Sequence, residues 1–252
     1  MNLMKYRENV QLSKSERLDA FQNSGWLAGV SSRSKIAEHA LFTNPAYRRR
    51  CAIHEAGHAV AAIAMGGSVV RLQLAGPMKP VFRRDGSECA NNVAAMADTL
   101  PLACSNERVQ ERLGVADEAE REAIAKVAMG HAFVSLAGPA AEARGQGLEL
   151  RRLDRQGRLG AASDMHVAKY HLGPFAGGDA NLANLIATIA ISADEMFGEP
   201  SVWAAVEAVA ELALQGVEEG DELMKVAKVY LPSQLSIAPL LTNSDGIGSL
   251  AL

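Results

Sequence analysis

The chain of 252 residues has few cysteines, few aromatic residues and little net charge. Its three cysteines, Cys51, Cys89 and Cys104, form no C-x-x-C pair. So sparse and odd a count argues against a disulfide framework and predicts a reducing, cytoplasmic location. Aromatic residues make up only 5% of the chain, while alanine and leucine are abundant, so we expect a mainly helical fold. The net charge of −4 argues against a general nucleic-acid-binding protein.

Long hydrophobic runs are also lacking. The segment from Met1 to Glu8 has no apolar core of a secretory signal. No stretch of about 18 uncharged apolar residues is present, so we predict no membrane span. The longest apolar candidates, near 182–193, are too short and are typical of a buried helix. A Walker A motif is absent as well, and nothing in the sequence predicts ATP binding.

The most informative segment is His-Glu-Ala-Gly-His at positions 54 to 58. On a helix, His54 and His58 project from the same face, one turn apart, because their spacing of four is close to the helical repeat. Two neutral imidazoles at this spacing can bind one metal ion. Glu55 lies beside the first ligand, where it can take a proton from a water molecule at the metal. This is the H-E-x-x-H pattern of zinc metallopeptidases.

The periodicity of apolar residues predicts the other elements. A strand is expected over 69–74, where apolar and polar side chains alternate, and 80–106 is expected to be irregular with short elements. Helical patterns predict helices over 45–66, 117–143, about 163–173, 179–197, 200–215 and 219–229. Gly138-Pro139 is expected to kink or divide the helix over 117–143.

A catalytic zinc site needs a third protein ligand from elsewhere in the chain. The candidates are Asp164, His166, His171, His131 and Glu142. From the residues alone, Asp164 fits a ligand and an acidic residue in the first turn of a helix about equally well. On the same helix, His166 should point away from Asp164, and His171 should lie two turns further on.

Three other side chains could lie near the metal without binding it. His131 and Glu142 fall on the apolar stripe of the 117–143 helix, where they are expected to be buried and hydrogen-bonded. Either could hydrogen-bond a ligand histidine and orient it without touching the metal. Cys51, one turn before His54, is expected to be a small buried side chain.

Several segments together resemble the peptidase domain of FtsH-type ATP-dependent zinc proteases. Residues 52–60 (AIHEAGHAV) resemble the metal helix of that family, and the 69–74 strand resembles its edge strand. Residues 136–142 (LAGPAAE) are similar to the family's Gly-Gly-Arg-x-Ala-Glu segment, with Pro139 in place of arginine. Residues 160–165 (GAASDM) are similar to Gly-Ala-x-x-Asp-Leu, whose aspartate is the third zinc ligand. The resemblance therefore implies Asp164 as the third ligand.

The resemblance spans roughly 47–230 and implies a helical zincin-like metallopeptidase domain with a small β-element after the H-E-x-x-H helix. We accordingly expect an N-terminal extension over 1–45, a peptidase domain over 46–231 and a C-terminal tail over 232–252. FtsH-type proteases join this domain to membrane helices and an ATPase module, and this sequence has neither. A separate ATPase or adaptor is one way to present substrates, and a homo-oligomer remains open.

Two segments depart from the family pattern. The segment 80–118 is longer than its counterpart and could alter the cleft or a contact between subunits. A run of arginines before Asp164 is expected to be a solvated loop, with a lid that contacts acidic peptides as the alternative. These arginines are Arg144, Arg151, Arg152, Arg155 and Arg158.

The function expected is a zinc-dependent endopeptidase in which His54, His58 and Asp164 bind Zn²⁺ and Glu55 is the general base. The substrate would be an unfolded or partner-presented protein, paired with the 69–74 strand by its backbone. One alternative is a non-proteolytic, zinc-stabilised binding or regulatory protein derived from a peptidase fold. Another is a protease that cleaves a single regulator.

Overall fold

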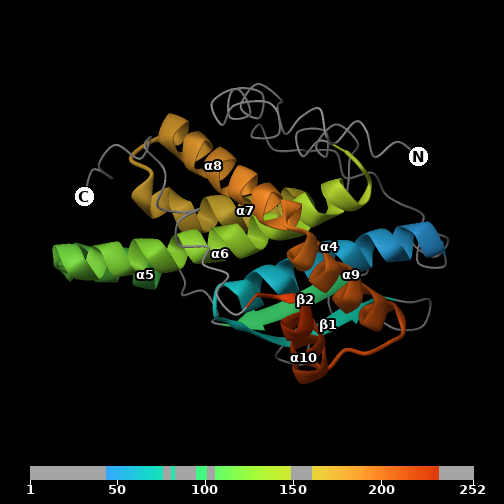
Figure 1. The fold of residues 1–252 in the computed structure, drawn as a ribbon. Helices are drawn as coiled ribbons and strands as arrows, with labels where there is room; N and C mark the ends of the chain where they lie inside the picture. The colour runs from blue at the N-terminus through green and yellow to red at the C-terminus, as the bar shows by residue number, and fades with distance from the viewer. Residues whose placement is uncertain (1–43, 76–80, 83–94, 101–105, 149–160, 233–252) are drawn as a thin grey trace.

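Seven α-helices and a two-stranded antiparallel sheet form the part of the chain that the computed structural model describes (Figure 1). These residues are 44–75, 81–82, 95–100, 106–148 and 161–232. The mainly α fold with a small β-element is therefore confirmed over this part. The expected N-terminal extension and C-terminal tail lie almost entirely outside the described residues.

The helix that carries the H-E-x-x-H motif is α4, Pro45–Ala64. Asn44 caps its N-terminus by accepting hydrogen bonds from the backbone N–H groups of Ala46 at 2.9 Å and Tyr47 at 3.2 Å. The chain leaves the helix at Gly66, whose φ of 79° is a left-handed conformation that favours glycine. Strand β1, Ser68–Leu74, follows directly. Both predicted elements are confirmed.

The partner of β1 is β2, Ala95–Leu100, which lies in the segment expected to be largely irregular. In the register of the pair, Leu72 faces Ala97. The N–H of Leu72 donates to the carbonyl of Glu218 at 3.0 Å, and Arg71 forms a β-bridge with Glu219. Both edges of β1 are therefore occupied at this point, and the expectation that β1 would pair with a peptide is wrong there. The outer edge belongs to β2.

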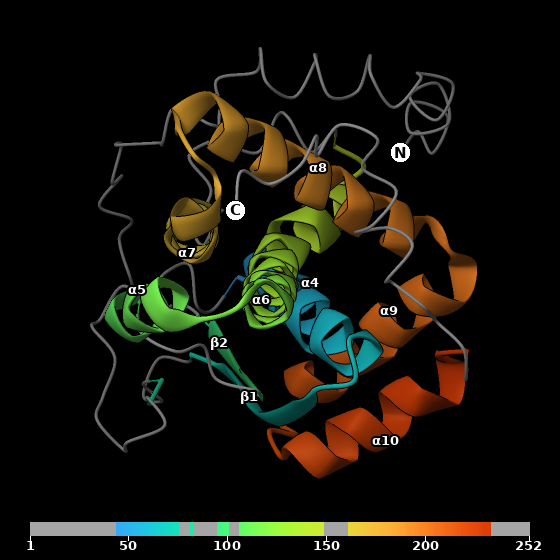
Figure 2. The ribbon, with the colours of Figure 1, turned by 90° about the vertical axis from the view of Figure 1, so that its left-hand side faces the viewer.

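Helix α6, Glu118–Gly145, begins at the Asp117 cap and runs on through Pro139. The expectation that Gly138-Pro139 would divide this helix is wrong. A proline inside a helix costs about 3 kcal/mol, and here packing offsets that cost because α6 contacts α4, α7 and α8. Figure 2, viewed nearly along α6, shows it surrounded by these elements.

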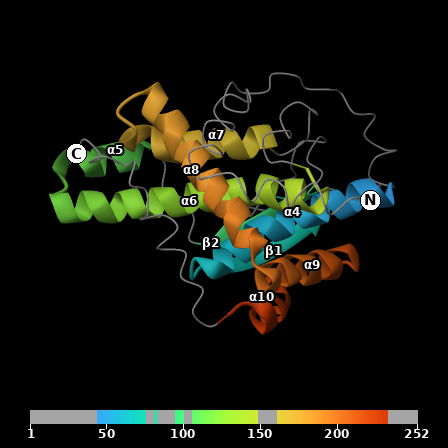
Figure 3. The ribbon, with the colours of Figure 1, turned by 45° about the horizontal axis from the view of Figure 1, so that its top comes forward.

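The remaining elements lie around α4 and α6. Figures 1 and 3 show the sheet, α9 and α10 on one side of α4, with α8 crossing α6 on the other side. Helix α5 was not expected, and α7 begins two residues before the Ser163 start that the sequence suggested. The bounds are α5 Asn106–Val115, α7 Ala161–Leu172, η5 Gly173–Phe175, α8 Asp179–Gly198, α9 Pro200–Leu214 and α10 Gly220–Tyr230.

Among the described helices, α6 is the one that is long and apolar enough to cross a membrane by length and composition. In the most apolar 18-residue stretch of α6, 50% is buried inside the protein. The core helix of a soluble protein meets the same criterion, so this feature alone gives weak support for a membrane span.

The two long helices α4 and α6 cross very closely, and two glycines make the crossing possible. A Cβ atom added at Gly57 would lie 2.6 Å from the Cβ of Ala141 and 2.8 Å from the carbonyl oxygen of Ala137. It would also lie 3.2 Å from the Cα of Gly138. Such contacts are closer than atoms can approach without displacement, so a side chain at Gly57 would force the helices apart.

We therefore predict that Gly57→Ala lowers the free energy of unfolding by about 1–3 kcal/mol, because the added methyl group meets backbone and Cβ atoms that cannot rotate away. Chemical denaturation of metal-free protein measures this loss. Gly114→Ala on α5 is the matched control, since nothing lies within 4 Å of an added Cβ there. Equal stability of wild type and Gly57→Ala would contradict the close crossing.

Candidate metal centre

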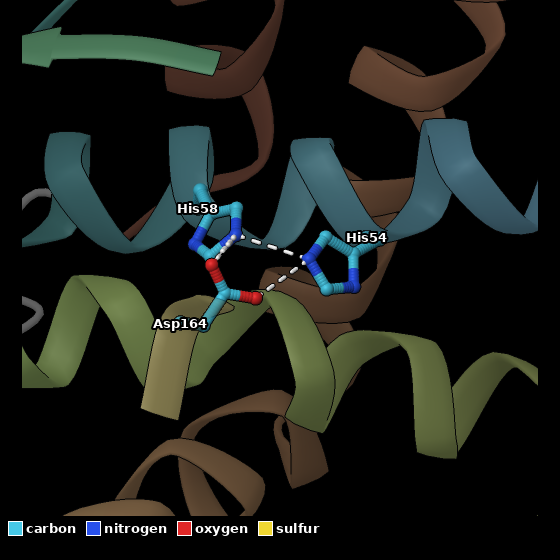
Figure 4. A group of neighbouring side chains, drawn as sticks. All are labelled: His54, His58 and Asp164. Atoms are coloured by element: carbon cyan, nitrogen blue, oxygen red, sulfur yellow. Dashed lines mark hydrogen bonds and ion pairs between the residues drawn. The ribbon is translucent and has the colours of Figure 1, made fainter. Parts of the chain in front are cut away.

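Two helices that are distant in sequence bring three metal-ligating side chains together. His54 and His58 project from one face of α4, and Asp164 reaches them from the first turn of α7 (Figure 4). The Nε2 atoms of the two histidines are 3.2 Å apart. Asp164 Oδ2 lies 2.9 Å from His54 Nε2, and its Oδ1 lies 3.6 Å from His58 Nε2. All three donor atoms fall within 4.8 Å of one another, so this buried group could hold a metal ion.

Both imidazoles are oriented by hydrogen bonds at their other nitrogen, and both partners lie on α6. His58 Nδ1 is 2.7 Å from the carbonyl oxygen of Val134, which can only accept, so Nδ1 carries the proton. His54 Nδ1 is 2.9 Å from Glu142 Oε2. These bonds select the tautomer that leaves each Nε2 free as a ligand.

The donor set itself fits a cation. With both Nδ1 atoms protonated, the two neutral Nε2 atoms and the Asp164 carboxylate can only accept hydrogen bonds. Their lone pairs converge on one point, and none of the three groups has a hydrogen to donate to the others. The space beside them is kept open by Gly138. A Cβ at that position would lie 2.8 Å from His54 Nε2 and still closer to His58 Nε2. A metal ion bound by all three groups resolves the conflict between acceptors.

Without a metal ion, a proton must lie between these acceptors, and the pKa values of His54, His58 and Asp164 shift as a result. Burial lowers the pKa of both histidines, but the hydrogen bonds and charge of Asp164 outweigh it and raise both above the usual value. Burial raises the pKa of Asp164, yet the two histidines hold it at about 2. The metal-free site is therefore an ion-paired cluster, and a bound metal replaces its protons.

Glu55, the predicted general base, is 9% exposed and lies next to this cluster. Burial raises its pKa, while the charges of His54 and His58 act in the opposite direction. The backbone N–H of Ala97 is a further, smaller influence that lowers the pKa of this carboxyl group, so Ala97 lies close to Glu55. The N–H of Leu72 points away from β2, toward Glu218, so Leu72 and Ala97 form a pair without hydrogen bonds between them. In such a pair the Ala97 N–H also points away from the partner strand, toward the outer edge of β2. Glu55 thus lies beside the outer edge of β2.

The other sequence candidates are not ligands of this group. His166 is exposed on α7 and points away, as expected. His131 and His171 pair with each other, with ring centroids 5.2 Å apart. Cys51 is a free thiol outside the ligand group, and burial raises its pKa to about 11. Glu142 is buried and hydrogen-bonded to His54, so the expectation of a buried, hydrogen-bonded side chain is confirmed.

Sequence reasoning missed the groups that complete this arrangement. The carboxylate of Glu142 also accepts from Gln146 Nε2 at 3.1 Å and pairs with Arg50 Nε at 3.2 Å. Arg50 lies one turn before His54 on α4, a spacing that could have indicated it. The Val134 carbonyl and the Ala97 N–H are backbone groups, and a sequence carries no signal for them. Of the arginine run, Arg144 stacks over Trp203 at 5.4 Å, and the others lie outside the described residues.

No protein-family model matches the chain, and no curated protein matches it either. The chemistry of the site therefore rests on its own geometry.

We predict that Glu142→Gln weakens zinc binding about 10–100-fold, because the amide keeps the shape but loses the charge that orients His54 and increases its basicity. Competition with a chromophoric chelator measures the affinity. Glu122→Gln is the control: Glu122 is also on α6, but it is exposed and pairs with Lys126 at 2.7 Å. An unchanged affinity for Glu142→Gln would show that the bond to His54 does not support the site.

Proposed function

We propose that the protein is a zinc-dependent endopeptidase that hydrolyses peptide bonds of unfolded or partner-presented proteins. One observation carries the proposal: a buried cluster of two histidines and one aspartate lies directly beside Glu55 of the same H-E-x-x-H helix. A purely structural metal site has no need of an adjacent, unligated carboxylate. An enzyme that activates water needs a base at this position.

Zinc is the metal that this donor set suits. Catalytic zinc sites use three protein ligands of the imidazole and carboxylate type and leave one coordination position open. Calcium and magnesium prefer six or more oxygen ligands, and here two of the three donors are nitrogens. When bound, zinc lowers the pKa of a water molecule to about 7 and polarises a carbonyl group.

The chain's own residues supply the remaining chemistry. Glu55 takes a proton from the attacking water at its carboxylate and delivers it to the leaving amine. Burial strengthens this base, because it raises the pKa of the carboxyl group. Glu142 and the Val134 carbonyl keep both imidazoles in one tautomer, so the ligands do not reorient during the reaction.

We propose β2 as the strand that pairs with an extended substrate. Among the described residues, β2 pairs with β1 alone, and no described strand lies on its outer side. The Ala97 N–H on this edge lies close enough to Glu55 to lower the pKa of its carboxyl group, so the edge is next to the proposed base. Backbone pairing of this kind selects an extended conformation more than a side chain, so broad specificity follows.

The proposal extends to a zincin-like domain related to the FtsH-type peptidases, because the segments that resemble that family supply all three ligands, Glu55 and Glu142. The substrate would be unfolded already or presented by a separate ATPase or adaptor. A cytoplasmic location follows from the sparse cysteines as part of the same proposal.

Glu55→Gln tests the mechanism. We predict that this variant binds zinc with an affinity close to that of wild type, because Glu55 is not a ligand, and that its cleavage of an unfolded protein such as casein falls at least 100-fold. His58→Ala should lose both zinc and cleavage. Metal analysis and a fluorescent casein assay measure the two properties on the same preparations.

Normal cleavage by Glu55→Gln would overturn the proposed mechanism. A zinc-loaded wild-type protein that leaves many unfolded substrates intact would favour the non-proteolytic alternative. Cleavage restricted to one partner protein would favour a regulator-specific protease.

A further inference from the structure

A second pair of histidines lies on the same two helices that frame the metal centre. His131 on α6 and His171 on α7 face each other across the helix interface, with ring centroids 5.2 Å apart and ring planes tilted by 32°. His171 follows Asp164 by seven residues on α7, and His131 precedes Gly138 by seven residues on α6. Two helical turns, about 10 Å, therefore separate this pair from the first cluster.

The ring of His171 is buried, with an exposed fraction of 8%, and it contacts the rings of His131 and of the edge-on Tyr170. Among the described residues, neither histidine ring makes a hydrogen bond. The hydroxyl of Ser135 donates to the backbone carbonyl of His131 and leaves its ring without a partner there. A buried polar group without a partner requires an explanation, such as a bound water or ion.

Both imidazoles are neutral at neutral pH, which is the form that binds metals. Burial lowers the pKa of His131. Burial and the neighbouring His131 together lower the pKa of His171 to about 4. A metal ion therefore does not have to displace a proton from either ring.

The spacing of the two rings also suits a shared ion. Two imidazoles that bind one zinc ion through one nitrogen each, at about 2.0–2.1 Å, have ring centroids about 5 Å apart. The two ligand histidines of the first cluster lie 4.9 Å apart by the same measure. The 5.2 Å between His131 and His171 is nearly the same.

We propose that His131 and His171 form a second binding site for a divalent transition-metal ion of the zinc, nickel and copper class. Water completes the coordination, so the ion binds more weakly than at the three-ligand cluster. Imidazole favours these ions over calcium or magnesium. Because the pair joins α6 to α7, an ion there also fastens the helix that carries Asp164. The inference does not rest on the proposed peptidase activity.

Titration of the metal-free, full-length protein with Zn²⁺ alone, followed by calorimetry and equilibrium dialysis, tests the site. Wild type should bind two equivalents of zinc, one tightly and one weakly, and His131→Gln should lose the weak one. Asp164→Asn should lose the tight equivalent and keep the weak one. His166→Gln is the matched control, since His166 is an exposed histidine on the same α7 helix. It should retain the wild-type stoichiometry.

Identical zinc stoichiometry and affinities in wild type and His131→Gln would overturn the second site. His131 is the first choice for substitution because it is only half-buried. If that variant fails to fold, Co²⁺ added to wild type beyond one equivalent should shift and broaden the ring NMR signals of His131 and His171. Unshifted signals would overturn the site as well. Failure of casein cleavage with both zinc equivalents present would count against the peptidase proposal alone.

Discussion

The close crossing of α4 and α6 is the constraint on which the rest of the structure depends. Gly57 on α4 and Gly138 on α6 face each other at this point, and neither position has room for a side chain. Gly57 lets the helix backbones approach, and Gly138 leaves space beside the two imidazoles. The same proximity brings the Val134 carbonyl and Glu142 within hydrogen-bonding distance of the histidines. Packing and metal-site geometry are thus set by one contact.

The electrostatics of the centre follow from this burial. A buried group of two imidazoles and two carboxylates is costly unless each charge is paired. Here Asp164 pairs with the histidines, while Arg50 and Gln146 satisfy Glu142. A dication held by His54, His58 and Asp164 would balance the charge of Asp164 without any proton on the histidines. Binding of such an ion would then be coupled to folding.

The sheet adds a second feature beside the cluster that could hold a metal ion, namely a strand edge next to Glu55. Strand β1 is paired on one side with β2 and bridged on the other by the turn before α10. It therefore serves as a support, and β2 presents the outer edge. The backbone N–H of Ala97 on this edge lies close to the Glu55 carboxyl group and lowers its pKa. A peptide that pairs with β2 would lie next to both Glu55 and the ligand cluster.

The sequence by itself determined the elements with strong local signals. The Asn44 cap, the helical spacing of His54 and His58 and the alternation over 69–74 are local, so α4 and β1 were predicted within a few residues. Asp164 was ambiguous from its residues alone and was chosen by family resemblance. Only tertiary structure decided that α6 continues through Pro139, that β2 forms, and that Asp164 meets the histidines while His171 meets His131. These outcomes depend on contacts between residues far apart in the chain, and local periodicity carries no information about such contacts.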